Sequence, residues 1–188
     1  MTSGRNSRRL TILAVGAALV LAGCDSPTNG DAAPTGGPST TPSSAPDVPT
    51  GYDPCTDIPQ SLLDAERLRS KDKDDSDASG VKWRGCVWNQ PDGYSPAIRT
   101  TNLTVDMVRD KKFADTREYI VNGRRAISTR QVDEHPDAVC TINVEMKGGS
   151  LEFFLSNPPS RKNTGSLDTC ELARTLAEKV VPTMPANV

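Results

Sequence analysis

The chain has little of what most metal and acid–base sites require. Its 188 residues include one histidine, and aromatic residues make up 4% of the total. A catalytic triad needs a nucleophile and an orienting partner around its histidine, and a zinc site needs several ligands at close spacing. The histidine, His135, lies in the acidic segment 133–137, which is typical of a solvated loop. The sequence therefore predicts no metal site, no cofactor and no histidine-based catalysis.

An excess of charge of one sign is also missing. The chain contains 22 Lys and Arg residues against 24 Asp and Glu residues, a net charge of −2. This balance gives no support for binding nucleic acid or an anionic membrane surface. Gly123 and Gly148–Gly149 have the context of turns, without the GxGxxG spacing that cradles phosphates. We therefore expect no nucleic-acid partner.

One long apolar run is present, Leu10–Leu21, preceded by three arginines. The run fits the core of a signal peptide and is short for a membrane-spanning helix. It ends in Leu-Ala-Gly-Cys, the pattern of a lipobox, which places Cys24 at the new N-terminus after cleavage. We expect a signal peptide over 1–23 and a lipoprotein anchored through Cys24 on the extracytoplasmic face of the cell membrane. The alternative is an ordinary signal peptide followed by an incidental cysteine.

The residues after Cys24 change abruptly in composition. Segment 24–50 is rich in Ser, Pro, Thr, Gly and Ala and has almost no branched aliphatic residues. Such a segment cannot bury enough apolar surface to offset its ordering entropy. We therefore expect a disordered linker over 24–50 and one globular domain over 51–188.

Four cysteines remain in the predicted domain: Cys55, Cys86, Cys140 and Cys170. An even number of cysteines in an exported domain indicates disulfides, and two of these would compensate for a core with few aromatics. Four cysteines allow three connectivities. We predict Cys55–Cys86 and Cys140–Cys170, because each pair joins the start of a predicted helix to a strand of the same half of the domain.

The hydrophobic patterning predicts an α+β fold. Apolar residues at helical spacing indicate helices over 57–69, with Asp57 as the N-cap, and over 166–181. Alternating segments and turn residues indicate strands over 81–88, 97–108, 119–121, 124–130, 138–147 and 150–156. The charged segment 71–80 has the composition of a solvated loop. We expect an antiparallel sheet of about five or six strands with the N-terminal and C-terminal helices packed on one face.

Other candidate sites have simpler interpretations. Four aspartates at positions 72, 74, 75 and 77 suggest calcium, but the loop lacks the glycine and the glutamate of a calcium-binding loop. Trp83 and Trp88 should point to opposite faces of their strand. Arg124 and Arg125 have the charge to hold an anion, although an arginine pair beside a hairpin is usually solvated.

Several short motifs together resemble a known family. They are Tyr-Asp-Pro-Cys at 52–55, Arg-Gly-Cys-Val-Trp at 84–88, Asn-Gly-Arg-Arg-Ala at 122–126, Val-Cys at 139–140 and Asp-Thr-Cys at 168–170. The chain resembles, over about residues 52–185, a family of actinobacterial secreted lipoproteins catalogued only as a domain of unknown function. The resemblance implies a compartment and a fold. It supplies no activity and no catalytic or ligand residues.

Two functions are compatible with these observations. The first is a noncatalytic module of the bacterial envelope that binds a protein partner or a small ligand. The second is a hydrolase of envelope material that uses carboxylates such as Asp106, Glu145 or Glu152. Two carboxylates facing each other across a deep cleft would favour the hydrolase. The absence of a recognisable nucleophile, base or metal motif leads us to expect the noncatalytic module.

Overall fold

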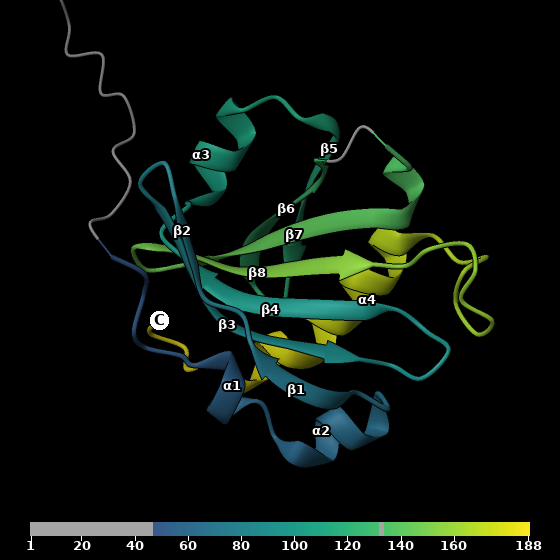
Figure 1. Cartoon of the computed structure of the whole chain (residues 1–188). Helices are drawn as coiled ribbons and strands as arrows, with labels where there is room; N and C mark the ends of the chain where they lie inside the picture. The colour runs from purple at the N-terminus through teal and green to yellow at the C-terminus, as the bar shows by residue number, and fades with distance from the viewer. Residues whose placement is uncertain (1–46, 132–133) are drawn as a thin grey trace, which may run out of the picture. The chain divides into compact units, whose positions relative to one another are not determined.

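The computed structural model describes residues 47–131 and 134–188. The predictions for the signal peptide, for Cys24 and for the linker up to residue 46 lie outside the described residues. The described chain forms an eight-stranded antiparallel sheet with helices against both of its faces (Figure 1). The strands are β1 (Arg69–Lys73), β2 (Ser76–Ala78), β3 (Val81–Asn89), β4 (Ser95–Thr101), β5 (Ala114–Val121), β6 (Arg124–Arg130), β7 (Val139–Met146) and β8 (Gly149–Ser156). The helices are α1 (Pro54–Asp57), α2 (Gln60–Ala65), α3 (Val105–Asp110) and α4 (Thr169–Val180), with short 3-10 turns η1 (Pro136–Ala138) and η2 (Val181–Thr183).

The strands follow the order β1-β3-β4-β8-β7-β6-β5, and β2 pairs with β3 beside β1. Four hairpins join sequence neighbours, β2 with β3, β3 with β4, β5 with β6 and β7 with β8. In the hairpin of β5 and β6, Asn122 and Gly123 both have positive φ, at 47° and 82°. A two-residue turn with positive φ at both positions matches the twist of the strands it joins. The last three of the four hairpins confirm the predictions from turn residues, and the hairpin of β2 and β3 was not predicted.

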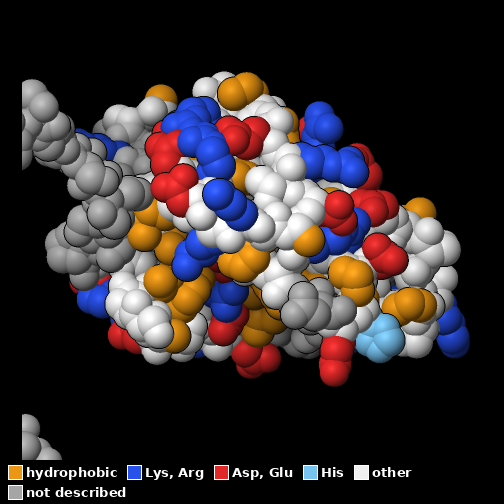
Figure 2. Space-filling model, turned by 90° about the horizontal axis from the view of Figure 1, so that it is seen from above, with side chains coloured by type: hydrophobic (Ala, Val, Ile, Leu, Met, Phe, Trp, Pro, Cys, Tyr) orange, Lys and Arg blue, Asp and Glu red, His pale blue; other side chains and the backbone are white. Residues whose placement is uncertain are grey.

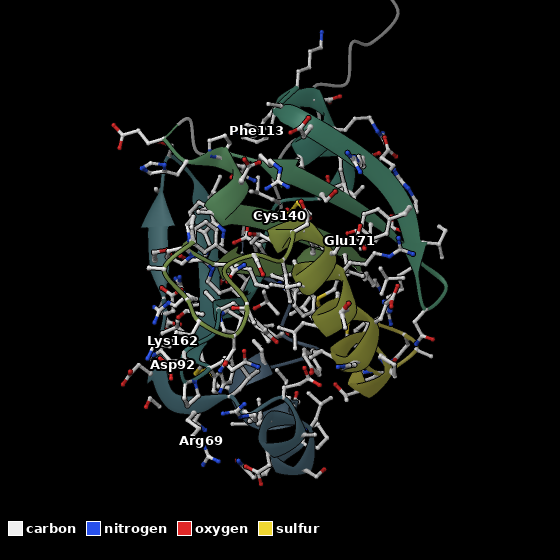
Figure 3. The ribbon with its side chains drawn as sticks, turned by 90° about the vertical axis from the view of Figure 1, so that its right-hand side faces the viewer. Arg69, Asp92, Phe113, Cys140, Lys162 and Glu171 are labelled. Carbon is white, nitrogen blue, oxygen red and sulfur yellow. A yellow bond between two sulfur atoms is a disulfide. The ribbon has the colours of Figure 1, made fainter. Side chains whose placement is uncertain are left out.

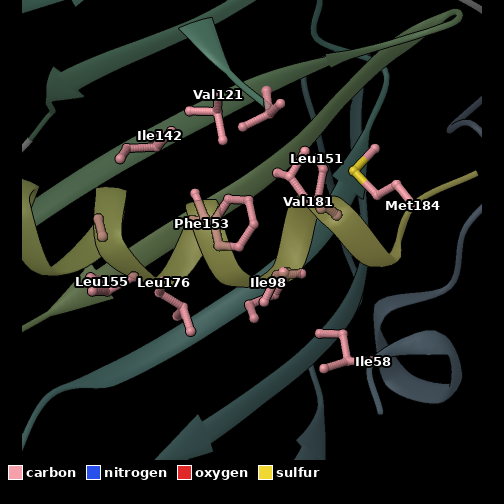
Figure 4. Close-up of a cluster of buried hydrophobic side chains, with 14 of the residues drawn as sticks. Ile58, Ile98, Val121, Ile142, Leu151, Phe153, Leu155, Leu176, Val181 and Met184 are labelled. Carbon is pink, nitrogen blue, oxygen red and sulfur yellow. The ribbon is translucent and has the colours of Figure 1, made fainter. Parts of the chain in front are cut away.

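The main core lies between one face of the sheet and α4. Asp168 caps α4 by accepting a hydrogen bond from the Glu171 amide at 3.0 Å, and the helix packs chiefly on β7 and β8. Residues of α1, α2 and the C-terminal 3-10 turn complete the same cluster (Figure 4). Its fully buried members include Ile98, Ile142, Leu151, Phe153, Leu155, Leu176 and Val180.

The N-terminal and C-terminal helices share the main core, as expected, but the opposite face of the sheet carries an additional helix, α3, that was not predicted. Leu103, Val105, Val108 and Ile127 form a second, smaller cluster there. The expected strand over 97–108 ends at Thr101 instead. The apolar residues after Thr101 alternate as in a strand, which led to the prediction. The Thr104 side chain instead accepts a hydrogen bond from the Met107 amide and caps the start of α3.

The N-terminal part of the domain also differs from the prediction. The expected helix over 57–69 is divided into α1 and α2, and Asp53 caps α1 in place of Asp57. The expected loop over 71–80 overlaps β1 and β2, which raises the strand number to eight. All residues of these two strands are exposed. Their sequences therefore lack alternating apolar residues and resemble that of a loop.

Both disulfides form with the predicted pairing. Cys55–Cys86 ties α1 to β3, and Cys140–Cys170 ties β7 to the first turn of α4. The two tryptophans point to opposite faces, as expected. Trp88 is buried in the main core, whereas Trp83 packs against the cluster beneath α3.

Candidate functional site

A groove of about 320 Å³ lies where the sheet extends beyond α4. Because α4 packs chiefly on β7 and β8, the next two strands along the sheet, β6 and β5, form the floor and far wall of an open channel. Figure 3 shows β5 curving past the N-terminal part of α4, with Glu171 on the helix and the Cys140 end of the disulfide nearby. The groove is lined by Asp115, Arg117, Glu118, Tyr119, Ser128, Arg130, Asp137, Asp168, Cys170, Glu171 and Arg174.

Arg130 holds one end of the groove together. Its side chain is only 9% exposed and donates to the carbonyl oxygens of Pro136 and Val139 and to the Asp168 carboxylate at 2.7 Å. Asp115 lies 3.6 Å from its Nε atom. One guanidinium therefore joins β6, β7, η1 and the start of α4, so this part of the groove is a fixed structure.

Tyr119 supplies a buried hydroxyl that Ser128 approaches without a hydrogen bond of good geometry. Its oxygen makes no hydrogen bond with the other described residues either. Ser128 and Arg174 both lie near this side chain, and the Arg174 guanidinium is 5.3 Å from the ring centroid. Burial raises the pKa of Tyr119, and the nearby Arg174 opposes that effect. A buried hydroxyl that is left unpaired costs free energy, which a suitable ligand group would recover.

The two walls of the groove carry opposite charges without an ion-pair partner, although Glu171 also lies in the first turn of α4 and interacts electrostatically with Arg174. Arg117 on β5 and Glu171 on α4 are both exposed, and neither side chain makes an ion pair or hydrogen bond within residues 47–131 and 134–188. Their neighbours are engaged: Glu118 accepts two hydrogen bonds from Arg109, at 2.5 and 2.7 Å. The groove thus offers to a ligand one cation, Arg117, and two carboxylates, Glu171 and Asp137, whose side chains make no ion pair or hydrogen bond among the described residues.

The carboxylates considered for hydrolysis have arginine partners. Asp106 accepts hydrogen bonds from Arg125 and Arg109, both at 2.6 Å, and Arg125 also reaches Glu145 at 3.4 Å. The hydrogen bond from Arg125 is the main reason why the pKa of Asp106 lies below its usual value. A general acid for glycoside cleavage needs a raised pKa instead.

Glu152 lies on the same face of the sheet as α3, nearly buried. It accepts hydrogen bonds from Arg99 at 2.5 Å and from the Trp83 indole at 3.1 Å. Arg99 in turn reaches Asp74 at 3.0 Å, and its guanidinium lies 5.8 and 5.7 Å from the ring centroids of Trp83 and Phe154. This arrangement is an ion-pair cluster packed between aromatic rings, and it joins the link between β1 and β2 to β3, β4 and β8.

The aspartates considered for calcium are also used in ion pairs. Asp74 pairs with Arg99, Asp75 with Lys73 and Asp77 with Arg84. Among the described residues, no group of three or more His, Cys, Asp or Glu side chains is placed to hold a metal ion. His135 is exposed at the surface (Figure 2). Figure 2 also shows acidic and basic side chains interleaved, without a broad surface of one sign.

Arg124 has a structural role at the C-terminus. It donates to the carbonyl oxygens of Pro185, at 2.6 Å, and of Val188. Its neighbour Arg125 is held by Asp106, as described above. Neither arginine of the Arg124–Arg125 pair is therefore available to hold an anion in this conformation.

The groove residues were missed by the sequence-based reasoning. They come from β5, β6, η1 and α4, and no spacing rule joins positions so far apart. Asp168 had a detectable signal, since an aspartate before a helical pattern is an N-cap candidate. That signal predicts a helix start and gives no indication of a groove beside it.

These features define a small α+β domain with two disulfides, one histidine and a polar groove beside its C-terminal helix. The chain belongs to the family described as "Protein of unknown function (DUF3558)", whose model matches residues 19–183. No curated protein and no solved structure gave a significant match. Within the described part of the chain, no helix has the length and apolarity needed to cross a membrane.

Proposed function

We propose that this protein is a noncatalytic binding module of the bacterial envelope and that the groove between β5 and α4 is its binding site. The single observation that supports this most is that Arg117 and Glu171, on opposite walls of the channel, make no ion pair or side-chain hydrogen bond in the part of the chain that the structure describes. A binding site needs a few polar groups that are fixed in position and not consumed by the fold. Arg130 and the Cys140–Cys170 disulfide supply the fixed frame.

The partner is an envelope protein or a small ligand, and nucleic acid is not proposed, because the charges of the domain are balanced and interleaved. Hydrolysis is not proposed either. Asp106, Glu145 and Glu152 each accept hydrogen bonds from an arginine, which favours a structural role for them.

The binding proposal is tested by site-specific crosslinking in cells. A photoreactive amino acid replaces Arg117 or Glu171 in the full chain, and the matched control replaces Arg69, which is exposed on β1 at the other edge of the sheet (Figure 3). We expect a discrete adduct from the two groove positions and none from position 69. Folded protein that gives no adduct at either groove position, or the same adducts at all three, would contradict the proposal.

We also propose that Cys24 is lipidated after removal of residues 1–23 and that the domain lies on the extracytoplasmic face of the cell membrane. Two disulfides support an oxidising compartment. The variant Cys24→Ser should leave the membrane fraction or accumulate as the uncleaved precursor, because no other residue in the lipobox can form the thioether. A Cys24→Ser protein that is processed normally and stays tightly membrane-bound would contradict this proposal.

A further inference from the structure

The groove runs along the free edge of the sheet. Arg117, Glu118 and Tyr119 are consecutive in β5, so their side chains alternate between the two faces, yet all three line the groove. Arg117 and Tyr119 share the α4 face and Glu118 lies between them in the chain, so the groove follows β5 along its length. β5 is the last strand in the order of the sheet, and no described strand pairs with its outer side.

The register of the hairpin identifies the backbone groups at that edge. Val121 opposes Arg124 across the two-residue turn, and the pairing continues without irregularity to Arg117 opposite Ser128. In an antiparallel pair, residues alternately direct their N–H and C=O groups toward the partner strand and away from it. Counting from the turn, Glu118 and Ile120 direct theirs away from β6.

The two edges of the sheet are protected to different degrees. At one edge, the β1–β3 pairing is interrupted between Arg69 and Asp72, and Lys71 and Lys73 lie on the outer strand. Irregular pairing and lysines are common devices against unwanted strand addition. β5 has an irregularity of the same kind, between Ala114 and Arg117, but it carries no lysine and leaves Ile120 60% exposed, one of the two large hydrophobic side chains most exposed in the described chain.

We propose that the partner is an extended polypeptide segment that pairs with β5 as an additional strand and places alternate side chains in the groove. This inference rests on the proposed binding function and specifies its ligand. Main-chain groups of Glu118 and Ile120 bind the backbone of the segment, as in other cases of strand addition. On the α3 face, an apolar side chain of the segment covers Ile120.

The charge of Arg117 specifies a second position of the segment. Arg117 and Ile120 are three positions apart in β5, so their side chains lie on opposite faces of the strand. An acidic side chain of the segment therefore meets Arg117 on the α4 face, three positions along from the apolar residue that covers Ile120. The recognised segment thus has an apolar residue and an acidic residue at this spacing.

The test uses a phage-displayed library of random nine-residue peptides, selected on the full chain carrying Cys24→Ser. The best peptides are then synthesised and their affinities measured by calorimetry. The main variant is Ile120→Pro, which removes an N–H that points away from β6 and so leaves the hairpin pairing intact; proline is tolerated on edge strands for this reason. The control is Ile120→Thr, which keeps the N–H and the strand preference.

We expect selected peptides to show an apolar residue and an acidic residue three positions apart and to lose at least tenfold in affinity for Ile120→Pro. The loss for Ile120→Thr should be smaller. Two sets of peptides are N-methylated, one at odd and one at even positions. Binding should be lost in one set and kept in the other, which tests the strand pairing without changing the protein. Circular dichroism and thermal melting of Ile120→Pro establish that it is folded; if it is not, the N-methylation series decides.

The outcomes separate this inference from the proposed function. Strand addition is overturned if the peptides bind folded Ile120→Pro as tightly as they bind the parent protein. It is also overturned if N-methylation at odd and at even positions is equally tolerated. In both cases the groove remains a binding site. A library that yields no binder, together with adducts at Arg117 and Glu171 in cells, also overturns strand addition alone. No binder and no adduct overturn both proposals.

Discussion

Arg99 and Glu152 form an ion pair in which both side chains are largely withdrawn from water, at 16% and 5% exposure. Their strands, β4 and β8, are neighbours, and the two residues are directly opposite in the register. A pair placed in this way behaves differently from the exposed pairs elsewhere on the domain, since the loss of one member leaves the other charge poorly solvated.

The variant Glu152→Leu should lower the free energy of unfolding by about 3–5 kcal/mol, because the buried guanidinium of Arg99 keeps only Asp74 as an ionic partner. The double variant Arg99→Met with Glu152→Leu should recover much of this loss. The control Arg84→Met removes an exposed pair with Asp77 and should cost much less than Glu152→Leu, because solvent screens that pair. Urea denaturation of the four proteins measures all three effects; equal losses for Glu152→Leu and Arg84→Met would contradict the expectation.

Gly85 provides the space for Arg99. A Cβ atom at this position would overlap the carbonyl oxygen of Ile98 and would lie 2.7 Å from the Cα atom of Arg99. Because these obstacles are backbone atoms of the paired strand, they cannot rotate away. We expect Gly85→Ala to destabilise the domain by about 1–3 kcal/mol, the range for overpacked positions.

The comparison for Gly85→Ala is Gly80→Asn. Gly80 has φ at +79° and open space around a hypothetical Cβ, and asparagine tolerates positive φ better than most residues. Thermal melting of both variants should show the larger decrease for Gly85→Ala. The opposite ranking would exclude steric overlap with β4 as the main effect.

The Cys140–Cys170 disulfide should be structural. It closes a segment with a sequence separation of 30, for which the chain-entropy model gives about 3–4 kcal/mol. Cys170→Ala should therefore lower the melting temperature and leave the Cys140 thiol buried and slow to react with a thiol reagent. Rapid labelling of Cys140 in the native variant would indicate that the α4 end of the groove opens without the disulfide.

Acid should weaken the ion pairs between α3 and the β5–β6 hairpin. Hydrogen bonds from Arg125 and from Arg109 hold the pKa values of Asp106 and Glu118, respectively, below their usual range. A lowered pKa contributes stability that is complete above the ordinary carboxyl pKa, about 4, and is lost as pH falls through the folded-state value. The parent should lose more stability between pH 7 and pH 3 than Arg109→Gln does, as measured by urea denaturation, and 1 M salt should reduce the difference. Identical pH dependence of the two proteins would contradict this assignment.

The features predicted correctly from sequence depend on local chemistry. Asn122–Gly123 adopts the positive φ values that its residue types favour, so the hairpin around it was predictable without knowledge of the rest of the fold. The disulfide pairing followed from the order of helices and strands. In each case the residues that determine the structure are neighbours in sequence or constrained by a covalent bond.

The incorrect predictions concern segments whose local sequence is compatible with two secondary structures and whose tertiary contacts decide between them. Residues 103–107 alternate like a strand, but the Thr104 cap and burial of Val105 and Val108 against β6 favour α3. The strands β1 and β2 are stabilised by pairing with β3 and lack the apolar alternation that reveals a strand. The groove was beyond prediction, since it exists only because β5 and β6 extend past α4.

The two ends of the described domain meet at one corner. Val188 packs against Gly51, and Arg124 fastens the last residues beside them. The backbone from residue 51 to residue 188 thus nearly closes on itself. The chain could therefore be joined at these ends and opened elsewhere without changing how its strands and helices pack. A short bridge between the ends, with a new opening in the exposed 160–163 loop, should give a circular permutant with the same sheet, both disulfides and the same groove.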